Sequence, residues 1–150
     1  MTLLAALIAP TAEAQDNGAE ISGRGPAVID SASLDFAGRQ VGLYGLQGTP
    51  VSQTCAIGSQ VWACGQEARW AAQNRVGNHW VVCVEQEQDS AGRPLAVCYL
   101  GGVGGPELNA WLVEQGWALA LRNDGAGDPA PYLAQEEAAR TAGRGLWRGR

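Results

Sequence analysis

Apolar and polar positions alternate most clearly over residues 41–45, where Val, Leu and Gly occupy every second position. Side chains of a strand point alternately to its two faces, so this period of two predicts a strand. Two shorter apolar stretches, 28–29 and 34–36, come before it, and Gly38 supplies a turn. The pattern predicts an antiparallel meander of short strands, followed by a loop over residues 48–60 that is rich in small and polar residues.

Residues 79–84 and 94–100 are apolar and flank the polar run 85–93, which predicts a β-hairpin with a long tip. Opposed residues of a hairpin have a constant index sum, and pairing Cys83 with Cys98 centres the turn inside the polar run. Directly opposed, non-hydrogen-bonded positions lie about 4.5 Å apart at Cα, within reach of a disulfide. The register therefore predicts a cross-strand Cys83–Cys98 bond.

The four cysteines are separated by gaps of eight, eighteen and fourteen residues. Zinc sites of four cysteines usually contain close Cys-x-x-Cys pairs, and His79 is the only histidine in the chain, so a zinc site is disfavoured. An even set of cysteines favours two disulfides formed in an oxidising compartment. With Cys83 and Cys98 joined, the second predicted bond is Cys55–Cys64.

Helical patterns cover residues 66–76, 106–115 and 132–142. A proline suits the first turn of the second helix, and glycines follow the second and third, where they end helices. Residues 117–121 predict a short buried strand. A length of 150 residues gives room for one compact domain and no support for two.

The N-terminal residues 1–14 contain an apolar run and end in Ala-Glu-Ala, which has the small-x-small form of a signal-peptidase site. They predict a signal peptide, and their shortness and lack of a basic residue before the run indicate a true start upstream of Met1. The run is too short for a membrane span, which needs about 20 apolar residues. The polar, glycine-rich residues 15–25 predict a flexible lead-in, and residues 26–150 the folded domain.

The chain has a formal net charge of −5, and all ten basic residues are arginines. A protein that holds a polyphosphate backbone normally presents a basic surface, so nucleic acid is expected to bind at most at a local patch. Arginine without lysine suits bidentate contacts to carboxylate or phosphate, although a GC-rich genome produces the same bias. Charge therefore argues against a general nucleic-acid surface.

Three stretches of the chain carry a more specific pattern. They read Asp89-x-x-Gly92-Arg93-x-Leu95-Ala96-x-Cys98, Leu108-Asn109-x-x-Leu112-Val113-x-x-Gly116-Trp117-Ala118 and Ala139-Arg140-x-Ala142-Gly143-Arg144-Gly145-Leu146-Trp147. In this order, over roughly residues 28–147, the chain resembles the thermonuclease-like (staphylococcal nuclease-like) family in its exported bacterial branch. The resemblance implies an α+β, mainly β fold: a five-stranded OB-type barrel with three packed helices.

Members of that family cut phosphodiester bonds with a calcium ion, a carboxylate that activates water and two arginines that neutralise the phosphate. The resemblance implies that two metal-binding aspartates correspond to Ala32 and Gln47, the first catalytic arginine to Gly42 and the general-base glutamate to Pro50. Only Arg93 matches a catalytic position of the family. A methyl group cannot hold calcium, so we expect no metal site and no cofactor, the family's calcium site being lost.

Three polar residues near these positions have structural interpretations. Asp30 is expected to hold the shape of its turn through an Asx-type hydrogen bond. Asp89 is close enough in sequence to pair with Arg93 at the hairpin tip. Asn109 is expected to bond the backbone near the start of its helix.

The sequence thus predicts a catalytically degenerate thermonuclease-like domain that acts as a non-enzymatic binding or structural protein of the cell envelope, periplasmic or secreted. One alternative is an active calcium-dependent nuclease for DNA or RNA with a rebuilt site. Another is an accessory subunit of a larger membrane or envelope complex. Trp62, in the loop closed by Cys55 and Cys64, is a candidate interface anchor for a protein partner that the sequence does not identify. No transmembrane segment is expected after signal removal.

Overall fold

The computed structural model describes residues 18–122 and 130–150, so the predicted signal peptide lies outside the described residues. The largest sheet contains β1 (Glu20–Arg24), β2 (Ala27–Asp30), β3 (Ser33–Phe36), β4 (Arg39–Leu43), β8 (Trp80–Gln88) and β9 (Pro94–Leu100). The strand order is β1-β8-β9-β4-β3-β2. β4 and β9 run parallel, and the other neighbours are antiparallel.

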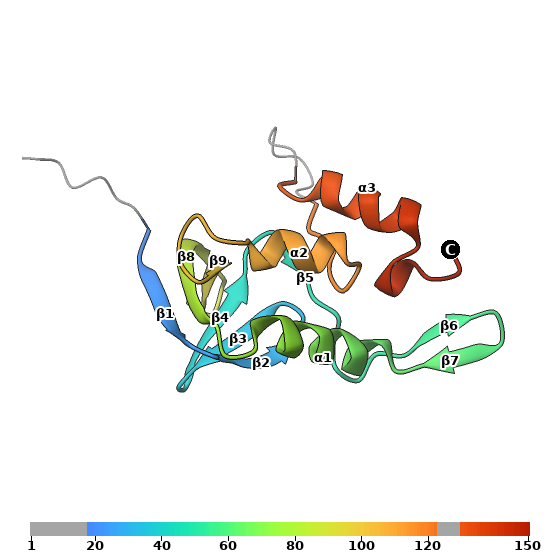
Figure 1. Cartoon of the computed structure of the whole chain (residues 1–150), viewed down its shortest axis with the longest axis horizontal. Coiled ribbons are helices and arrows are strands. Elements are labelled where there is room, and N and C mark those ends of the chain that lie inside the picture. Colours follow the sequence, from blue (N-terminus) through green and yellow to red (C-terminus); the bar gives the residue numbers. More distant parts are fainter. Residues whose placement is uncertain (1–17, 123–129) are drawn as a thin grey trace, which may run out of the picture.

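The sheet closes into a barrel because β1 and β2 are two halves of one bent strand. Gly25 and Pro26 separate them, and Gly25 has φ +53°, a left-handed conformation that glycine adopts without strain. β1 pairs with β8 at one edge of the sheet, and β2 pairs with β3 at the other. The chain therefore forms the expected five-stranded OB-type barrel, within an α+β fold (Figure 1).

The expectation of a flexible lead-in over residues 15–25 is wrong where β1 lies. All five residues of β1 pair with β8, and Ile21 is buried in the core. The polar, glycine-rich sequence does not favour a strand by itself, but the pairing satisfies backbone groups along the edge of β8 that would otherwise lack partners. Ordered structure therefore begins before Pro26, while residues 15–17 lie outside the described part of the chain.

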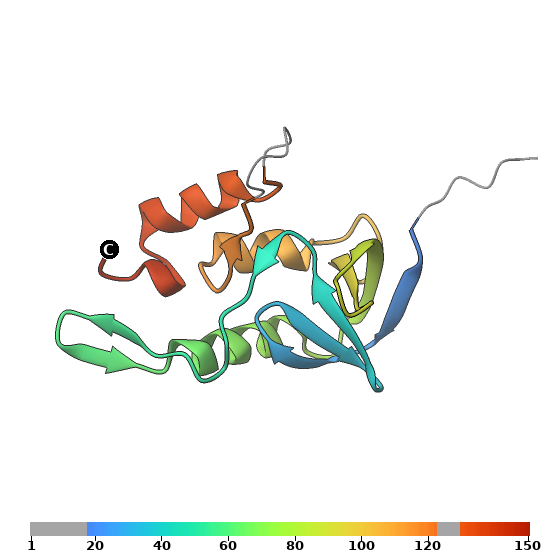
Figure 2. The same ribbon diagram turned by 180° about the vertical axis from the view of Figure 1, so that it is seen from behind.

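Three helices surround the barrel: α1 (Cys64–Val76), α2 (Leu108–Glu114) and α3 (Leu133–Ala142). α1 packs along β2 and α2 along β9 (Figures 1 and 2). α3 packs on α2 and on β10 (Leu119–Ala120), which pairs with β5 (Leu46–Gln47). The short 3-10 helix η1 (Gly145–Trp147) then folds back against α3. Among the described helices, none is long and apolar enough to cross a membrane.

The core of the barrel contains the predicted cross-strand disulfide. Cys83 and Cys98 lie opposite each other on β8 and β9, are fully buried and form a disulfide with a Cα–Cα distance of 4.0 Å. Both the hairpin register and the bond are therefore confirmed. The largest fully buried side chains around it include Leu34, Leu108, Leu112, Val28, Val41, Val76, Val81 and Val113.

One polar side chain, Asn109, is fully buried at the start of α2. Its Oδ1 accepts a hydrogen bond from Cys98 N at 3.0 Å, and its Nδ2 donates to Tyr44 O at 3.0 Å and to Ala96 O at 3.1 Å. The partners are backbone groups of the barrel rather than of its own helix start, which corrects the expected bonding. Asn109 therefore joins α2 to β9 and to the chain after β4.

The second disulfide joins a small hairpin to α1. β6 (Cys55–Ile57) and β7 (Gln60–Trp62) pair antiparallel where a loop was expected, because the backbone groups of a two-residue turn and its flanks satisfy one another. Cys55 is bonded to Cys64, the first residue of α1, which confirms the predicted bond. The hairpin projects past the N-terminal end of α1, away from the barrel (Figures 1 and 2).

Candidate functional site

A small pocket beside the barrel gathers most of the positions that the resemblance relates to catalysis. Its volume is about 220 Å³, and we call it the Arg93 pocket. Ala32 comes from the turn between β2 and β3, Gly42 from β4, Pro50 from the loop after β5, and Arg93 from the position just before β9. The other lining residues are Asp30, Ser33, Leu43, Leu46, Gly48 and Leu95. Gln47 does not line it.

Arg93 is held from two sides. Its Nε donates to Asp89 Oδ2 at 3.1 Å, which confirms the expected pair, and its Nη1 donates to Ser33 Oγ at 3.1 Å. The contact with Ser33, on β3, was not foreseen from the sequence because β4 lies between β3 and β9, so the contact depends on how the strands are ordered in the barrel. The side chain of Arg93 remains 35% exposed, so part of the guanidinium faces the pocket and solvent.

The glycine at position 42 leaves space that the Arg93 guanidinium fills. A Cβ placed on Gly42 would lie 3.1 Å from Arg93 Nη2 and 2.5 Å from Leu95 Cδ2. Both atoms are at the ends of flexible side chains, so a larger residue fits here only after these two side chains rotate away. The residue at position 42 therefore determines where Arg93 lies.

The turn that carries Ala32 is fixed by hydrogen bonds within the protein. Asp30 Oδ1 accepts from Ala32 N at 2.8 Å, which confirms the expected Asx turn. The buried Ser31 accepts at Oγ from Thr49 N at 2.8 Å, and Thr49 Oγ1 donates to Trp117 O at 2.9 Å. The turn is thereby tied to the loop after β5, and one oxygen of Asp30 already serves the backbone.

Gln47 and Pro50 contribute no acid or base to the site. Gln47 is exposed on β5, opposite Leu119 of β10. Pro50 is exposed at the rim of the Arg93 pocket, and its carbonyl accepts a hydrogen bond from Gln53 N at 2.9 Å. A general base must exchange a proton near neutral pH, which neither an amide nor a proline side chain does.

The donor set of the Arg93 pocket does not fit the calcium ion that the family implies. Calcium typically takes about six to eight oxygen ligands, several of them carboxylates. The pocket is lined by the carboxylate of Asp30, which is already half used by the backbone, and by the cation of Arg93. Within residues 18–122 and 130–150, no three His, Cys, Asp or Glu side chains are grouped so as to hold a metal.

The pKa of Asp89 is lowered from its ordinary value, chiefly because the carboxylate accepts the backbone N–H of Arg93. The guanidinium of Arg93 and the N–H of Ala91 act in the same direction. A carboxylate with a depressed pKa stabilises the fold above its unfolded pKa, and that stabilisation is lost as the pH falls through the folded pKa. Asp89→Asn should therefore lose less stability than the wild type below about pH 4.

Urea unfolding at stepped pH values measures this difference. Glu87→Gln, an exposed change on the same hairpin, is the control and should follow the wild-type curve. Identical acid sensitivity of Asp89→Asn and the wild type would contradict the role given to Asp89.

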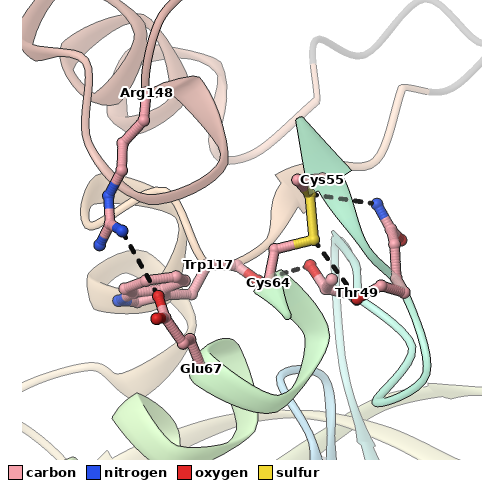
Figure 3. The surroundings of a disulfide bond; sticks show 7 residues. Thr49, Cys55, Cys64, Glu67, Trp117 and Arg148 are labelled. Atoms are coloured by element: carbon pink, nitrogen blue, oxygen red, sulfur yellow. Dashed lines mark hydrogen bonds and ion pairs between the residues drawn. A yellow bond between two sulfur atoms is a disulfide. The ribbon is translucent and has the colours of Figure 1, made fainter. Parts of the chain in front are cut away.

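Trp62 does not stand free on its hairpin. It is half-buried and lies edge-on to Trp117, with ring centroids 6.4 Å apart. Arg148 lies over both rings, its Cζ 4.7 Å from the Trp62 centroid and 5.5 Å from that of Trp117. Figure 3 shows Arg148 beside Trp117 and its ion pair with Glu67 at 3.4 Å. The indole of Trp62 is thus engaged within its own domain, and partner binding at this residue stays a prediction. Several arginines lie near the C-terminus of the sequence, but the sequence gives no sign that Arg148 covers these two rings.

Two other tryptophans are more accessible than Trp62. The side chain of Trp70, on α1, is 69% exposed, and that of Trp80, at the start of β8, is 44% exposed. The sequence did not predict whether either of them is buried or exposed. The helical period could have indicated that Trp70 is exposed, since it places this residue on the side of α1 opposite the buried Ala68 and Ala72.

Comparison with known proteins agrees with this architecture. The sequence model of the family described as staphylococcal nuclease homologue matches residues 38–149. The succinoglycan biosynthesis protein ExoI of Rhizobium meliloti (strain 1021) is 27% identical over 124 residues, which cover 81% of this chain and 62% of that protein. This chain therefore spans less than two thirds of the relative's length. Because the family match covers well over half of the chain, including β4, β8, β9 and all three helices, the chain belongs to the staphylococcal nuclease homologue family.

Proposed function

We propose that this chain is a non-enzymatic member of its family and acts as a binding or structural component of the cell envelope. The observation that carries the proposal is the composition of the Arg93 pocket. It combines one arginine with the half-used carboxylate of Asp30, and positions 42, 47 and 50 bear no ionisable side chain. Hydrolysis of a phosphodiester needs an activated water and charge stabilisation on the phosphate. This set offers one carboxylate that is already bonded to the backbone, too few oxygen ligands for calcium and one arginine.

The missing groups would each have contributed a large factor to the rate. One missing transition-state donor typically removes about 10² to 10³ in rate, and one missing general base about 10² to 10⁴. Asp89 also pairs with the arginine that remains, which offsets its charge toward a phosphate. What remains is a single, partly neutralised cation without the groups beside which it would act.

A periplasmic or secreted location forms part of the proposal. Two disulfides suit an oxidising compartment outside the cytoplasm, and the predicted signal peptide agrees with export. The name of the ExoI relative concerns succinoglycan biosynthesis, so a second candidate function is an accessory subunit in the assembly of an envelope polysaccharide. Stable co-purification of this chain with a membrane-associated assembly would favour this second function.

A phosphodiesterase assay on DNA and RNA with added calcium tests the main proposal, with staphylococcal nuclease as the positive reference. We expect no cleavage above the buffer control, and no effect of Arg93→Ala or of Arg39→Ala, a control at an exposed arginine outside the pocket. Calcium should leave the thermal midpoint unchanged, because only a ligand that binds the folded state raises it. Cleavage that a calcium chelator stops and Arg93→Ala abolishes would instead identify a nuclease with a rebuilt site.

A further inference from the structure

A second, larger groove runs along the outer face of α1. Gln66, Arg69, Trp70 and Gln73 line it at helical positions i, i+3, i+4 and i+7, which lie on one face of a helix. Val51 and Glu67 add to its walls. Its volume of about 600 Å³ is in the range of about 300 to 1,000 Å³ that is usual for ligand pockets. The groove shares no lining residue with the Arg93 pocket, so it is a separate feature.

Trp70 gives this groove a rigid aromatic surface. It lies in the middle of a 13-residue helix, and its side chain is 69% exposed. Within the described ranges its ring makes no aromatic pair and carries no arginine, in contrast to the rings of Trp62, Trp111, Trp117 and Trp147. The indole face is therefore free to stack on a flat or chair-shaped ligand.

Two of the polar side chains beside Trp70 are fixed by hydrogen bonds to the backbone of β2 and still have donors left over for a ligand. Arg69 Nε donates to Val28 O at 3.1 Å, which fixes the guanidinium and leaves its terminal N–H groups free of any bond to another described residue. Gln73 Oε1 accepts from Val28 N at 3.3 Å, which leaves its amide N–H₂ for a ligand. Gln66 is exposed and, within the described part of the chain, its side chain makes no hydrogen bond. Donors and acceptors thus surround one open indole.

We propose that this groove binds a pyranose ring of an oligosaccharide, stacked on Trp70 and hydrogen-bonded through its hydroxyls to Gln66, Arg69 and Gln73. A pyranose ring has an apolar C–H face that an indole covers, and a rim of hydroxyls that both donate and accept. Amide and guanidinium side chains match that rim. The proposal is independent of whether the chain cleaves phosphodiesters, because it uses none of the residues of the Arg93 pocket.

The charge of the groove favours a saccharide over single-stranded nucleic acid. Nucleic-acid channels combine stacking aromatics with a positively charged groove that follows the phosphates. Here the lining carries one arginine, Arg69, and one glutamate, Glu67, which pairs with Arg148 outside the groove, and the chain as a whole has a net charge of −5. A protein interface is less favoured, because glutamate is depleted in interface cores, whereas this groove places Glu67 and two amides around a single ring.

The test is a titration of the labelled protein with cellotetraose, maltotetraose and trigalacturonate, monitored by ¹H–¹⁵N NMR in calcium-free buffer. The indole N–H signal of Trp70 is assigned by its absence in Trp70→Ala. We expect at least one of the three saccharides to shift this signal with a Kd of about 1 mM or tighter. Trp70→Ala should weaken that binding at least tenfold, Trp70→Phe should restore part of it, and Gln66→Ala should weaken it several-fold.

Trp80→Ala is the matched control, because Trp80 is also exposed but does not line the groove. It should leave the affinity unchanged, and both exposed tryptophans can be replaced without disturbing the core. The proposal is overturned if none of the three saccharides shifts the Trp70 signal at about 10 mM. It is also overturned if Trp70→Ala binds as tightly as the wild type, or if a thymidine decamer shifts the signal and no saccharide does.

Discussion

Asn109→Ala is expected to reduce the free energy of unfolding by about 3 to 5 kcal/mol. The substitution removes one acceptor and two donor bonds at a fully buried position. The N–H of Cys98 and the carbonyl of Tyr44 then lose their side-chain partner, whereas the carbonyl of Ala96 keeps its bond from Tyr44 N at 2.8 Å. Each buried polar group left unsatisfied costs about 1 to 3 kcal/mol. Domains of this kind are stable by about 5 to 15 kcal/mol, so the loss is a large part of the total.

Urea unfolding followed by tryptophan fluorescence measures this loss. Asn74→Ala is the matched control, since Asn74 is exposed on α1 and alanine favours a helix. The control should change stability by less than about 0.5 kcal/mol. A loss below about 1 kcal/mol for Asn109→Ala would show that the barrel does not depend on this side chain.

Gly116→Ala is expected to destabilise the fold by about 2 to 5 kcal/mol. Gly116 has φ +79°, where a side chain is strained, and a Cβ there would lie 2.1 Å from the carbonyl oxygen of Arg144. That oxygen belongs to the backbone, which cannot rotate away as a side-chain end can. A backbone hydrogen bond also joins η1 to the turn after α2, because Leu146 N donates to Gly116 O at 2.9 Å. Methyl insertion should therefore separate η1 from the end of α2.

Gly92→Ala separates the two contributions to that loss. Gly92 has φ +80°, and a Cβ there would have nothing within 4 Å, so this variant carries the conformational strain without the clash. We expect it to lose about 1 kcal/mol. Thermal and urea unfolding of the two variants give the comparison, and equal losses would show that the approach of Gly116 to Arg144 is not tight.

The elements that the sequence predicted are those determined by local pattern. The spacing of Cys83 and Cys98 about a polar tip was enough to set the hairpin register, because opposed positions follow from simple counting. The residues after Gln15 show the limit of such reasoning. Glu20–Arg24 has a sequence typical of a loop, and it forms β1 because the edge of β8 is available in the closed barrel. That edge forms only when strands distant in sequence come together, so no local pattern reveals it.

The candidate site, too, was predicted from the sequence only in part. The resemblance implied that Ala32, Gly42, Pro50 and Arg93 occupy related positions, and the structure brings all four to one pocket. It did not indicate that Arg93 would fill the space over Gly42 and bond Ser33, since both contacts depend on the packing of three strands. The stacking of Arg148 on Trp62 was equally out of reach, because the two residues are far apart in the chain and meet through η1.

The two disulfides bear on the order in which the chain can form its bonds. The bonded cysteines are 9 and 15 residues apart, and each cysteine is joined to its nearest neighbour in sequence. Of the three ways to pair four cysteines, this one closes the shortest loops and so has the smallest entropic cost. A chain that appears N-terminus first exposes Cys55 and Cys64 together before Cys83 is accessible. Sequential oxidation therefore yields the native pairing without any bond having to be reshuffled.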